Sequence, residues 1–375
     1  MIYFDNAATT MPSEVSVNSF LEAAKIYANP SSTHFAGIKA DELLKESRKI
    51  IAKSIGAKET EIYFVPSGTF ANNIAILGIA KAQKRNGNHI IISNSEHPSV
   101  YNTAISLQKE GFEVTLLNTT GGNISITELK NALRPTTILT SVMFTNNETG
   151  SVYDIQNISK TVKKINKNTF VHCDAVQAYL KEPISVNGLG IDLLSVSAHK
   201  VHAIKGCGAL YVRGTTRLEN IIFGGGQEKN LCSGTQSVPL IYAFAKCVEK
   251  DYLNLSKNNT YVSYIKALIS EKLEEIGCII NHSEKESPYI LSVAIPGIKS
   301  EIMLNYLSGN GICVSAGSAC SARAKSNRVL TSFGLSESIA DTTIRISLSE
   351  YNSENEALEL IKHINNAKNS LIKKF

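Results

Sequence analysis

Two predicted strands end in side chains that could act together on a carbonyl compound. The apolar run Asp192–Ser197 is followed by His199 and Lys200, so an amine stands at the carboxyl end of a strand. A lysine in this place can form a Schiff base, although most lysines at strand ends are simply exposed to solvent. A second run, Phe170–Cys173, ends at Asp174. Lys200 alone therefore does not establish a Schiff-base site, and its interpretation depends on the residues near it.

Asp174 suits a cofactor that contains a pyridine ring. A carboxylate can keep a pyridinium nitrogen protonated, which makes pyridoxal phosphate an electron sink. Gln177 follows three residues later. The simpler interpretation is that Asp174 only caps the helix that follows. The cofactor interpretation is favoured because a lysine at a strand end, Lys200, follows later in the chain.

Residues 61–69 predict a strand, a turn of small residues and the start of a helix. Backbone N–H groups at a helix start, together with the hydroxyl of Thr69, can bind phosphate, although the same turn also suits a plain helix cap. His97 follows the predicted strand His89–Ser93 and could stack on a ring or move protons, although a single loop histidine is usually structural. Because His199 and His202 have no carboxylate or cysteine at ligand spacing, we expect no catalytic metal.

Cys320 lies among minimal side chains, which predicts an accessible loop and a nucleophilic thiol. The other six cysteines lie mostly beside strand or helix residues. The absence of a CxxC pair argues against a disulfide framework or a structural zinc site. Arg345 interrupts an apolar predicted strand, so it either faces solvent or binds a carboxylate with both arms of its guanidinium.

The elements that must position these residues follow a clear pattern. From about residue 60 to 215, short apolar runs alternate with helical segments, which predicts an α/β fold with a mostly parallel sheet and ligands at its carboxyl edge. After a polar stretch at 255–260 we predict a long amphipathic helix, Tyr261–Ile276, and a smaller α+β unit. The expected domains are a segment over 1–13 that packs with the small domain, a large cofactor-binding domain over 14–255, and a small domain over 256–375 that carries the cysteine loop.

The composition excludes several classes of function. The 375 residues carry a formal net charge of +5 that is spread along the chain, so a small anionic ligand is expected and a direct nucleic-acid partner is not. No run approaches the roughly 20 apolar residues of a membrane span, and the beginning of the sequence lacks the features of a secretory signal. These observations predict a cytoplasmic protein.

Taken together, the sequence resembles the cysteine desulfurases, pyridoxal-phosphate enzymes of the class V aminotransferase group, over nearly its whole length. The resemblance implies the type I fold of such enzymes, with a mostly parallel seven-stranded sheet flanked by helices in the large domain and a smaller C-terminal α+β domain. The motifs occur in the family's order: Asp5-Asn-Ala-Ala-Thr-Thr10, Asn29-Pro-Ser-Ser-Thr-His34, Ser95-Glu-His97, Asn146-Asn-Glu-Thr-Gly150, His172-Cys-Asp-Ala-Val-Gln177, Ser197-Ala-His-Lys200, Gly224-Gly-Gly-Gln227, Ser233-Gly-Thr235 and Ser318-Ala-Cys320.

The resemblance also implies a role for each matching residue. Lys200 would bind the pyridoxal phosphate covalently and then act as a base on the substrate. Asp174 would pair with the pyridine nitrogen, His97 would stack on the ring and act as acid or base, and Gln177 would bond the phenolic oxygen. The phosphate would be held by five residues, the last of them from a second subunit of a homodimer: Gly68, Thr69, Ser197, His199 and Thr235.

For the substrate, the resemblance implies L-cysteine, with its carboxylate bound by Asn147 and Arg345. Cys320 would take the sulfur as a persulfide, leaving L-alanine, and would pass it to an acceptor such as an iron–sulfur scaffold or a tRNA-thiolating enzyme. Two alternatives stay open: a selenocysteine lyase or another class V lyase that does not need Cys320, and a catalytically weak protein that only handles sulfur. Four departures from the family's usual residues put substrate preference, rate and partner choice in question: Phe70, Asn72, Ala203-Ile204 and Cys232.

Overall fold

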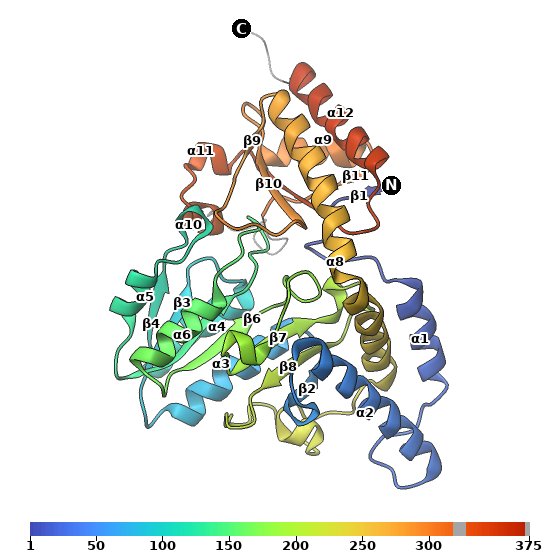
Figure 1. Ribbon diagram of the computed structural model, residues 1–375, viewed down its shortest axis with the longest axis vertical. Coiled ribbons are helices and arrows are strands. Elements are labelled where there is room, and N and C mark those ends of the chain that lie inside the picture. The colour runs from blue at the N-terminus through green and yellow to red at the C-terminus, as the bar shows by residue number, and fades with distance from the viewer. Residues whose placement is uncertain (318–327, 372–375) are drawn as a thin grey trace.

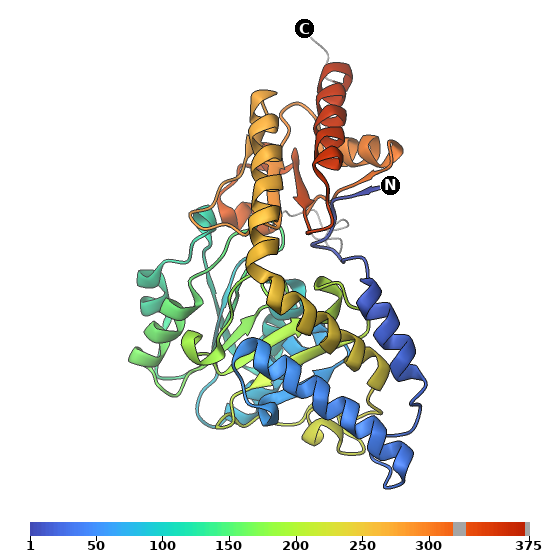
Figure 2. The ribbon, with the colours of Figure 1, turned by 45° about the vertical axis from the view of Figure 1, so that its right-hand side comes forward.

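The computed structural model describes residues 1–317 and 328–371. A large part built on one sheet lies below a smaller part that carries the C-terminal helix (Figure 1). Helix α8 (Val238–Glu275) runs from the large part into the small one, as the turned view in Figure 2 also shows. Among the described residues, no helix combines the length and the apolar character that crossing a membrane requires.

The sheet of the large part has seven strands in the order β2-β8-β7-β6-β5-β3-β4. Only β8 runs against the others, since it pairs antiparallel with both β2 and β7. β3 and β5 are buried along their whole length, as expected where helices cover both faces of a parallel sheet. The predicted fold class is confirmed. The bounds are β2 (Ile62–Val65), β3 (His89–Ser93), β4 (Glu113–Leu117), β5 (Thr137–Met143), β6 (Phe170–Asp174), β7 (Leu193–Ser197) and β8 (Gly208–Val212).

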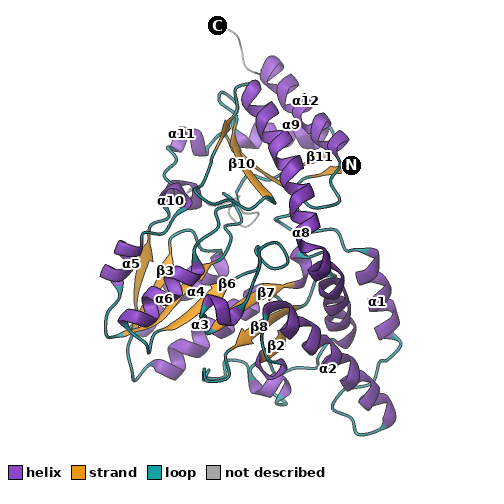
Figure 3. Ribbon diagram, viewed as in Figure 1, coloured by secondary structure: helices purple, strands orange, loops and turns teal. Residues whose placement is uncertain are grey.

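Helices cover both faces of this sheet (Figure 3). α3 and α4 pack on one face through Ile74 and Val100, whereas α2 and α6 pack on the other through Leu44 and Ile158. The spacing of apolar residues along each helix gives it one buried side, which fixes its orientation on the sheet. The bounds are α1 (Glu14–Ala24), α2 (Phe35–Ile55), α3 (Gly68–Gln83), α4 (Pro98–Leu107), α5 (Ile126–Ala132), α6 (Ile155–Ile165) and α7 (Val186–Leu189).

The small part contains the antiparallel sheet β12-β10-β9 and a separate parallel pair in which the N-terminal strand β1 lies beside β11. Its core includes Phe4 from the N-terminal segment, so the two ends of the chain are folded together. The bounds are β1 (Ile2–Tyr3), β9 (Ile279–Ile280), β10 (Ile290–Ala294), α9 (Ser300–Gly309), β11 (Ile312–Cys313), α10 (Arg328–Phe333), α11 (Glu337–Ala340), β12 (Thr343–Ser347) and α12 (Glu354–Leu371).

The polar stretch 255–260 is not a break between elements. The helix predicted to begin at Tyr261 begins at Val238, and it continues without interruption through the polar stretch. The stretch contains no proline or glycine, and its Asn259 bonds the carbonyl of Lys181 and the hydroxyl of Tyr289. Such bonds let a polar segment remain helical. The domain boundary predicted at 255/256 falls inside this helix and stays a prediction.

Candidate active site

A cavity of about 280 Å³ lies at the carboxyl edge of the large sheet. Its walls come from the segments after β3, β5, β6 and β7, the start of α3, the N-terminal segment and β12 of the small part. Strand ends in a parallel sheet meet at one edge, which brings together residues far apart in sequence. The cavity is lined by these predicted site residues: Gly68, Thr69, His97, Asn147, Asp174, Gln177, Ser197, His199, Lys200 and Arg345.

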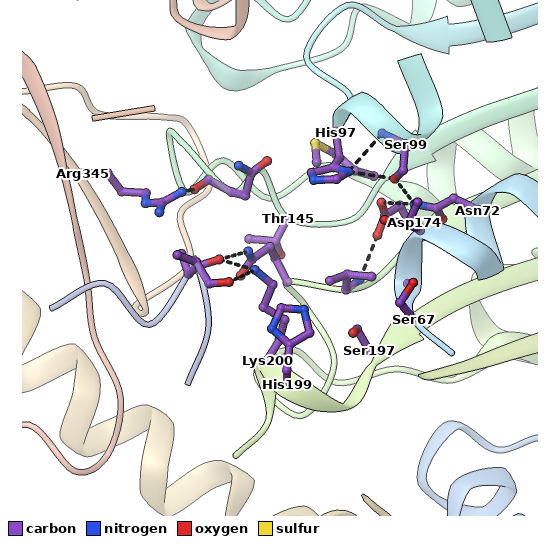
Figure 4. A pocket seen from close by; sticks show the side chains of 18 residues that line it. Ser67, Asn72, His97, Ser99, Thr145, Asp174, Ser197, His199, Lys200 and Arg345 are labelled. Carbon is purple, nitrogen blue, oxygen red and sulfur yellow. Dashed lines mark hydrogen bonds between the residues drawn. The ribbon is translucent and has the colours of Figure 1, made fainter. Parts of the chain in front are cut away.

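Lys200 ends the short 3₁₀ helix η4 (Ala198–Lys200), which directly follows β7. Its Nζ atom donates hydrogen bonds to the backbone carbonyls of Ala7, at 2.5 Å, and Ala8, at 2.7 Å (Figure 4). Burial, together with the positive charge of Arg345, lowers the pKa of Lys200 to about 7. At neutral pH a large share of the amine is therefore unprotonated, the form that attacks a carbonyl carbon.

This lowered pKa predicts unusual reactivity of Lys200. In cofactor-free protein, acetylation of Lys200 by acetic anhydride should be half-maximal near pH 7 and should fall about tenfold for each pH unit below that, because only the free amine reacts. Mass spectrometry of labelled peptides measures this rate, with the exposed Lys164 as the comparison. If Lys200 and Lys164 gain reactivity over the same pH range, the buried environment does not control the amine.

Asp174 ends β6 and presents a fixed carboxylate. One oxygen accepts the backbone N–H of Val176 at 3.0 Å, and the other accepts the side-chain amide of Asn72 at 2.7 Å. The first bond is the local capping contact expected of an aspartate at this place, yet the group still lines the cavity. His97, the cap residue of α4, lines it too, and burial lowers the pKa of its imidazole. The site thus holds a carboxylate and a neutral imidazole.

The start of α3 packs closely against the segment after β6 and the end of β7. A Cβ atom on Gly68 would lie 2.7 Å from Cγ2 of Val176 and 3.3 Å from Cβ of Ser197, so a larger residue would displace its neighbours. Ser67 caps the helix by accepting the N–H of Phe70 at 3.3 Å. Because the amino end of a helix carries partial positive charge and free N–H groups, this wall suits a phosphate group.

Arg345 brings a positive charge from the small part into the cavity. Its side chain is almost fully buried in β12. One Nη donates to the carbonyl of Asn147 and the other to the carboxylate of Asp5, both at 2.8 Å. Its Nε is buried and has no partner. A buried guanidinium with an unused donor is well suited to bind a further carboxylate.

The cavity concentrates unsatisfied polar atoms. Among the described residues, five buried side-chain atoms without a partner belong to residues that line it: Asn72 Oδ1, Thr145 Oγ1, Gln177 Oε1, Ser197 Oγ and Arg345 Nε. Buried polar groups nearly always have partners, so these atoms indicate a polar ligand. A helix start for phosphate, a carboxylate for a ring nitrogen, an amine for an aldehyde and a guanidinium for a carboxylate together fit pyridoxal phosphate and an amino acid.

The two remaining predicted site residues, Cys320 and Thr235, have different outcomes. Cys320 falls outside the described residues. Thr235 lines a separate hollow of about 140 Å³ near β2, together with Cys207 and Cys232. Its predicted role requires a second subunit and stays a prediction.

A family model described as aminotransferase class-V matches residues 2–360 of the chain. The cysteine desulfurase IscS of Clostridium botulinum (strain Hall) is 36% identical over 366 residues, which cover 95% of this chain and 91% of that protein. The chain belongs to the cysteine desulfurase family. Among solved structures, a NifS-like protein has a TM-score of 0.94 at 34% identity and covers 98% of this chain and 99% of its own. SspA in complex with cysteine has a TM-score of 0.84 at 34% identity, covering 94% of this chain and 100% of its own.

Cysteine desulfurases depend on pyridoxal phosphate, so the predicted family and cofactor are confirmed. The sequence did not indicate that the carbonyls of Ala7 and Ala8 or the side chains of Asn72, Ser99 and Thr145 belong to the site. Thr145 could have been found from its place two residues after β5, at the edge where the other site residues gather. The carbonyls carry no side-chain signal, so only the fold reveals them.

Proposed function

We propose that this protein is a pyridoxal-phosphate-dependent cysteine desulfurase that converts L-cysteine into L-alanine and takes the sulfur onto Cys320. One observation carries the proposal: Lys200, Asp174, His97 and Arg345, which lie on separate segments of the chain, line a single cavity. Membership of the family and the cysteine in the related SspA structure support cysteine as the substrate.

The proposed residues for the cofactor each meet one of its chemical groups. Lys200 would hold the aldehyde carbon, Asp174 the ring nitrogen and Gln177 the phenolic oxygen, with His97 against the ring. When bound, pyridoxal phosphate supplies an electron sink for the substrate carbons beside the amine. The proposed phosphate ligands are the residues at the α3 start and after β7, with one from a second subunit: Gly68, Thr69, Ser197, His199 and Thr235.

Arg345 would orient the substrate by its carboxylate. Asp5 and the Asn147 carbonyl each use one hydrogen of an Nη, so we propose the unpartnered Nε and the second Nη hydrogens as the donors for the substrate. The side chain of Asn147, which also lines the cavity, would be the second contact. The free amine of Lys200 would then take the proton from the substrate Cα atom, and His97 would exchange a proton with the substrate.

The sulfur step would form a disulfide-type bond on Cys320. The bond between Cβ and sulfur of the substrate breaks, sulfur bonds to Sγ of Cys320, and Cβ receives a proton, so one cysteine and one thiol give one alanine and one persulfide without an external oxidant. Burial raises the thiol pKa of the four buried cysteines, which makes them poor nucleophiles: Cys173, Cys207, Cys247 and Cys278.

We also propose the finer features that the family resemblance implies. The protein would act as a homodimer, because the Thr235 segment lies away from the cavity of its own chain and would reach that of a second copy. Its sulfur acceptor would be an iron–sulfur scaffold or a tRNA-thiolating enzyme, and its location the cytoplasm.

Substitution Arg345→Lys should mainly weaken substrate binding. A lysine keeps the charge but loses the planar fork, and a hydrogen bond to a charged group contributes about 1.5–3 kcal/mol, so KM for L-cysteine should rise by roughly 10- to 100-fold. Steady-state kinetics of the loaded enzyme measure the effect. The matched control is Arg134→Lys, since Arg134 forms an exposed ion pair with Glu113. An unchanged KM would mean that Arg345 only supports Asp5.

The proposed function is tested by loading the protein with pyridoxal phosphate and recording its absorption spectrum before and after addition of L-cysteine. The expected result is a yellow protein whose spectrum changes with cysteine, and alanine and sulfide released in equal amounts when a reductant is present. A protein that binds the cofactor but yields neither product from cysteine would contradict the proposal.

A further inference from the structure

Asp174 and His97 are the two groups proposed to face the cofactor ring. The side chain of Asn72, in the second turn of α3, links them through Ser99. Its Nδ2 atom donates one hydrogen to Oδ2 of Asp174 at 2.7 Å and the other to Oγ of Ser99 at 2.8 Å (Figure 4). Asn72 is 1% exposed, so water cannot replace these bonds. Both amide hydrogens are thereby used.

The bond from Asn72 occupies one acceptor site of the Ser99 hydroxyl. Because Oγ of Ser99 accepts from Asn72, its own hydrogen is free to point to Nδ1 of His97, which lies 2.7 Å away. The same Nδ1 accepts the backbone N–H of Ser99 at 3.1 Å. The backbone N–H has a fixed direction, and the Ser99 hydroxyl can donate to the same nitrogen, so an unprotonated Nδ1 satisfies both groups. In the neutral ring this favours a proton on Nε2.

We propose that Asn72 and Ser99 are positioning residues that hold His97 in the neutral tautomer with its proton on Nε2, so that His97 meets the substrate as a proton donor. This inference rests on the proposed function, which places the substrate beside His97. It also gives the departure at position 72 a physical meaning. An aspartate there would accept the Ser99 hydroxyl hydrogen, turn it away from His97 and place a second carboxylate next to Asp174.

The tautomer can be measured without cofactor or substrate, by nitrogen NMR of protein with ¹⁵N-labelled histidine, since protonated and unprotonated ring nitrogens resonate far apart. The signals of His97 are assigned by their loss in His97→Gln. We expect Nδ1 of the wild-type protein to be unprotonated and Nε2 protonated at neutral pH. A proton on Nδ1 of the neutral ring would overturn the inference.

Asn72→Asp tests the role of Asn72 itself. Besides the new carboxylate, the charged groups that act on His97 are Asp174, Lys200 and Arg328. An added negative charge within about 6 Å favours the charged imidazole, so the proton affinity of His97 should rise by about tenfold or more. The control is Asn102→Asp, at an exposed position on α4, in which the proton affinity of His97 should not change. If both variants titrate like the wild type, Asn72 does not position His97.

Kinetics of the loaded enzyme give a second readout. Asn72→Asp should lower kcat by about tenfold or more, because a positioned acid or base contributes roughly 10²- to 10⁴-fold, while KM for cysteine stays within about twofold. Ser99→Ala, which retains the backbone donor, should have a smaller effect. An unchanged kcat in Asn72→Asp would overturn the inference. Failure of the wild-type protein to turn over cysteine would instead refute the proposed function, and the tautomer of His97 would still be measurable.

Discussion

Lys200→Ala is expected to abolish turnover of L-cysteine. The variant lacks the amine that would both hold the cofactor and move the substrate proton, and a positioned base alone is worth roughly 10²- to 10⁴-fold. We expect a loss of at least about 10³-fold in kcat and a weaker, altered cofactor absorbance. Alanine production and the absorption spectrum of the loaded protein measure both effects.

The control for this variant is Lys164→Ala, which removes an exposed lysine from α6. It should leave activity and spectrum as in the wild type. Unfolding of both variants in denaturant should show comparable stability, because the hydrogen bonds of the Lys200 amine within the described part of the chain are to two backbone carbonyls. Substantial alanine production by Lys200→Ala would contradict the proposed role.

Cys320→Ala is expected to stop sulfur transfer while the cofactor stays bound. Removal of the nucleophile should reduce alanine formation to the background level, since no other thiol is proposed to receive the sulfur. The spectrum should still change on addition of cysteine, because the cavity that we propose for the substrate is intact. Alanine and sulfide assays with and without a reductant measure the loss.

Two comparisons make this result specific. Cys232→Ala, at the half-buried thiol beside Thr235, should retain transfer, since burial raises the pKa of Cys232. The alternative of a selenocysteine lyase predicts that Cys320→Ala still acts on selenocysteine but not on cysteine. Equal activity of Cys320→Ala and wild type on cysteine would remove Cys320 from the reaction.

Much of the large part could be predicted because its strands are short, apolar and separated by helical periods. The prediction for β3 is correct to the residue, and the strand that ends at Asp174 differs from the prediction by one residue. That His97, Asp174 and Lys200 line one cavity could be predicted because the ends of parallel strands meet at one edge, whereas their roles stay predictions. Helix α8 was predicted to begin too late, because polar side chains were interpreted as a break although their bonds keep them helical.

Contacts between distant segments could not be predicted. Lys200 lies against the carbonyls of Ala7 and Ala8, and Arg345 against Asp5, but no local pattern links these positions. The departures show the same limit. Asn72 lines the cavity, whereas Phe70 is 44% exposed and Cys232 lines a different hollow. From the residue types alone it could not be predicted that Asn72 lines the cavity and that Phe70 and Cys232 do not.

Lys200 and Cys320 are proposed to act on the same substrate molecule. A single-turnover experiment tests it: the loaded enzyme is mixed with less than one equivalent of ³⁵S-labelled L-cysteine without a reductant, and alanine and the labelled peptides are quantified by chromatography and mass spectrometry. We predict one alanine for each labelled sulfur, with the sulfur on the peptide that contains Cys320. Alanine formed without sulfur on that peptide would contradict the account.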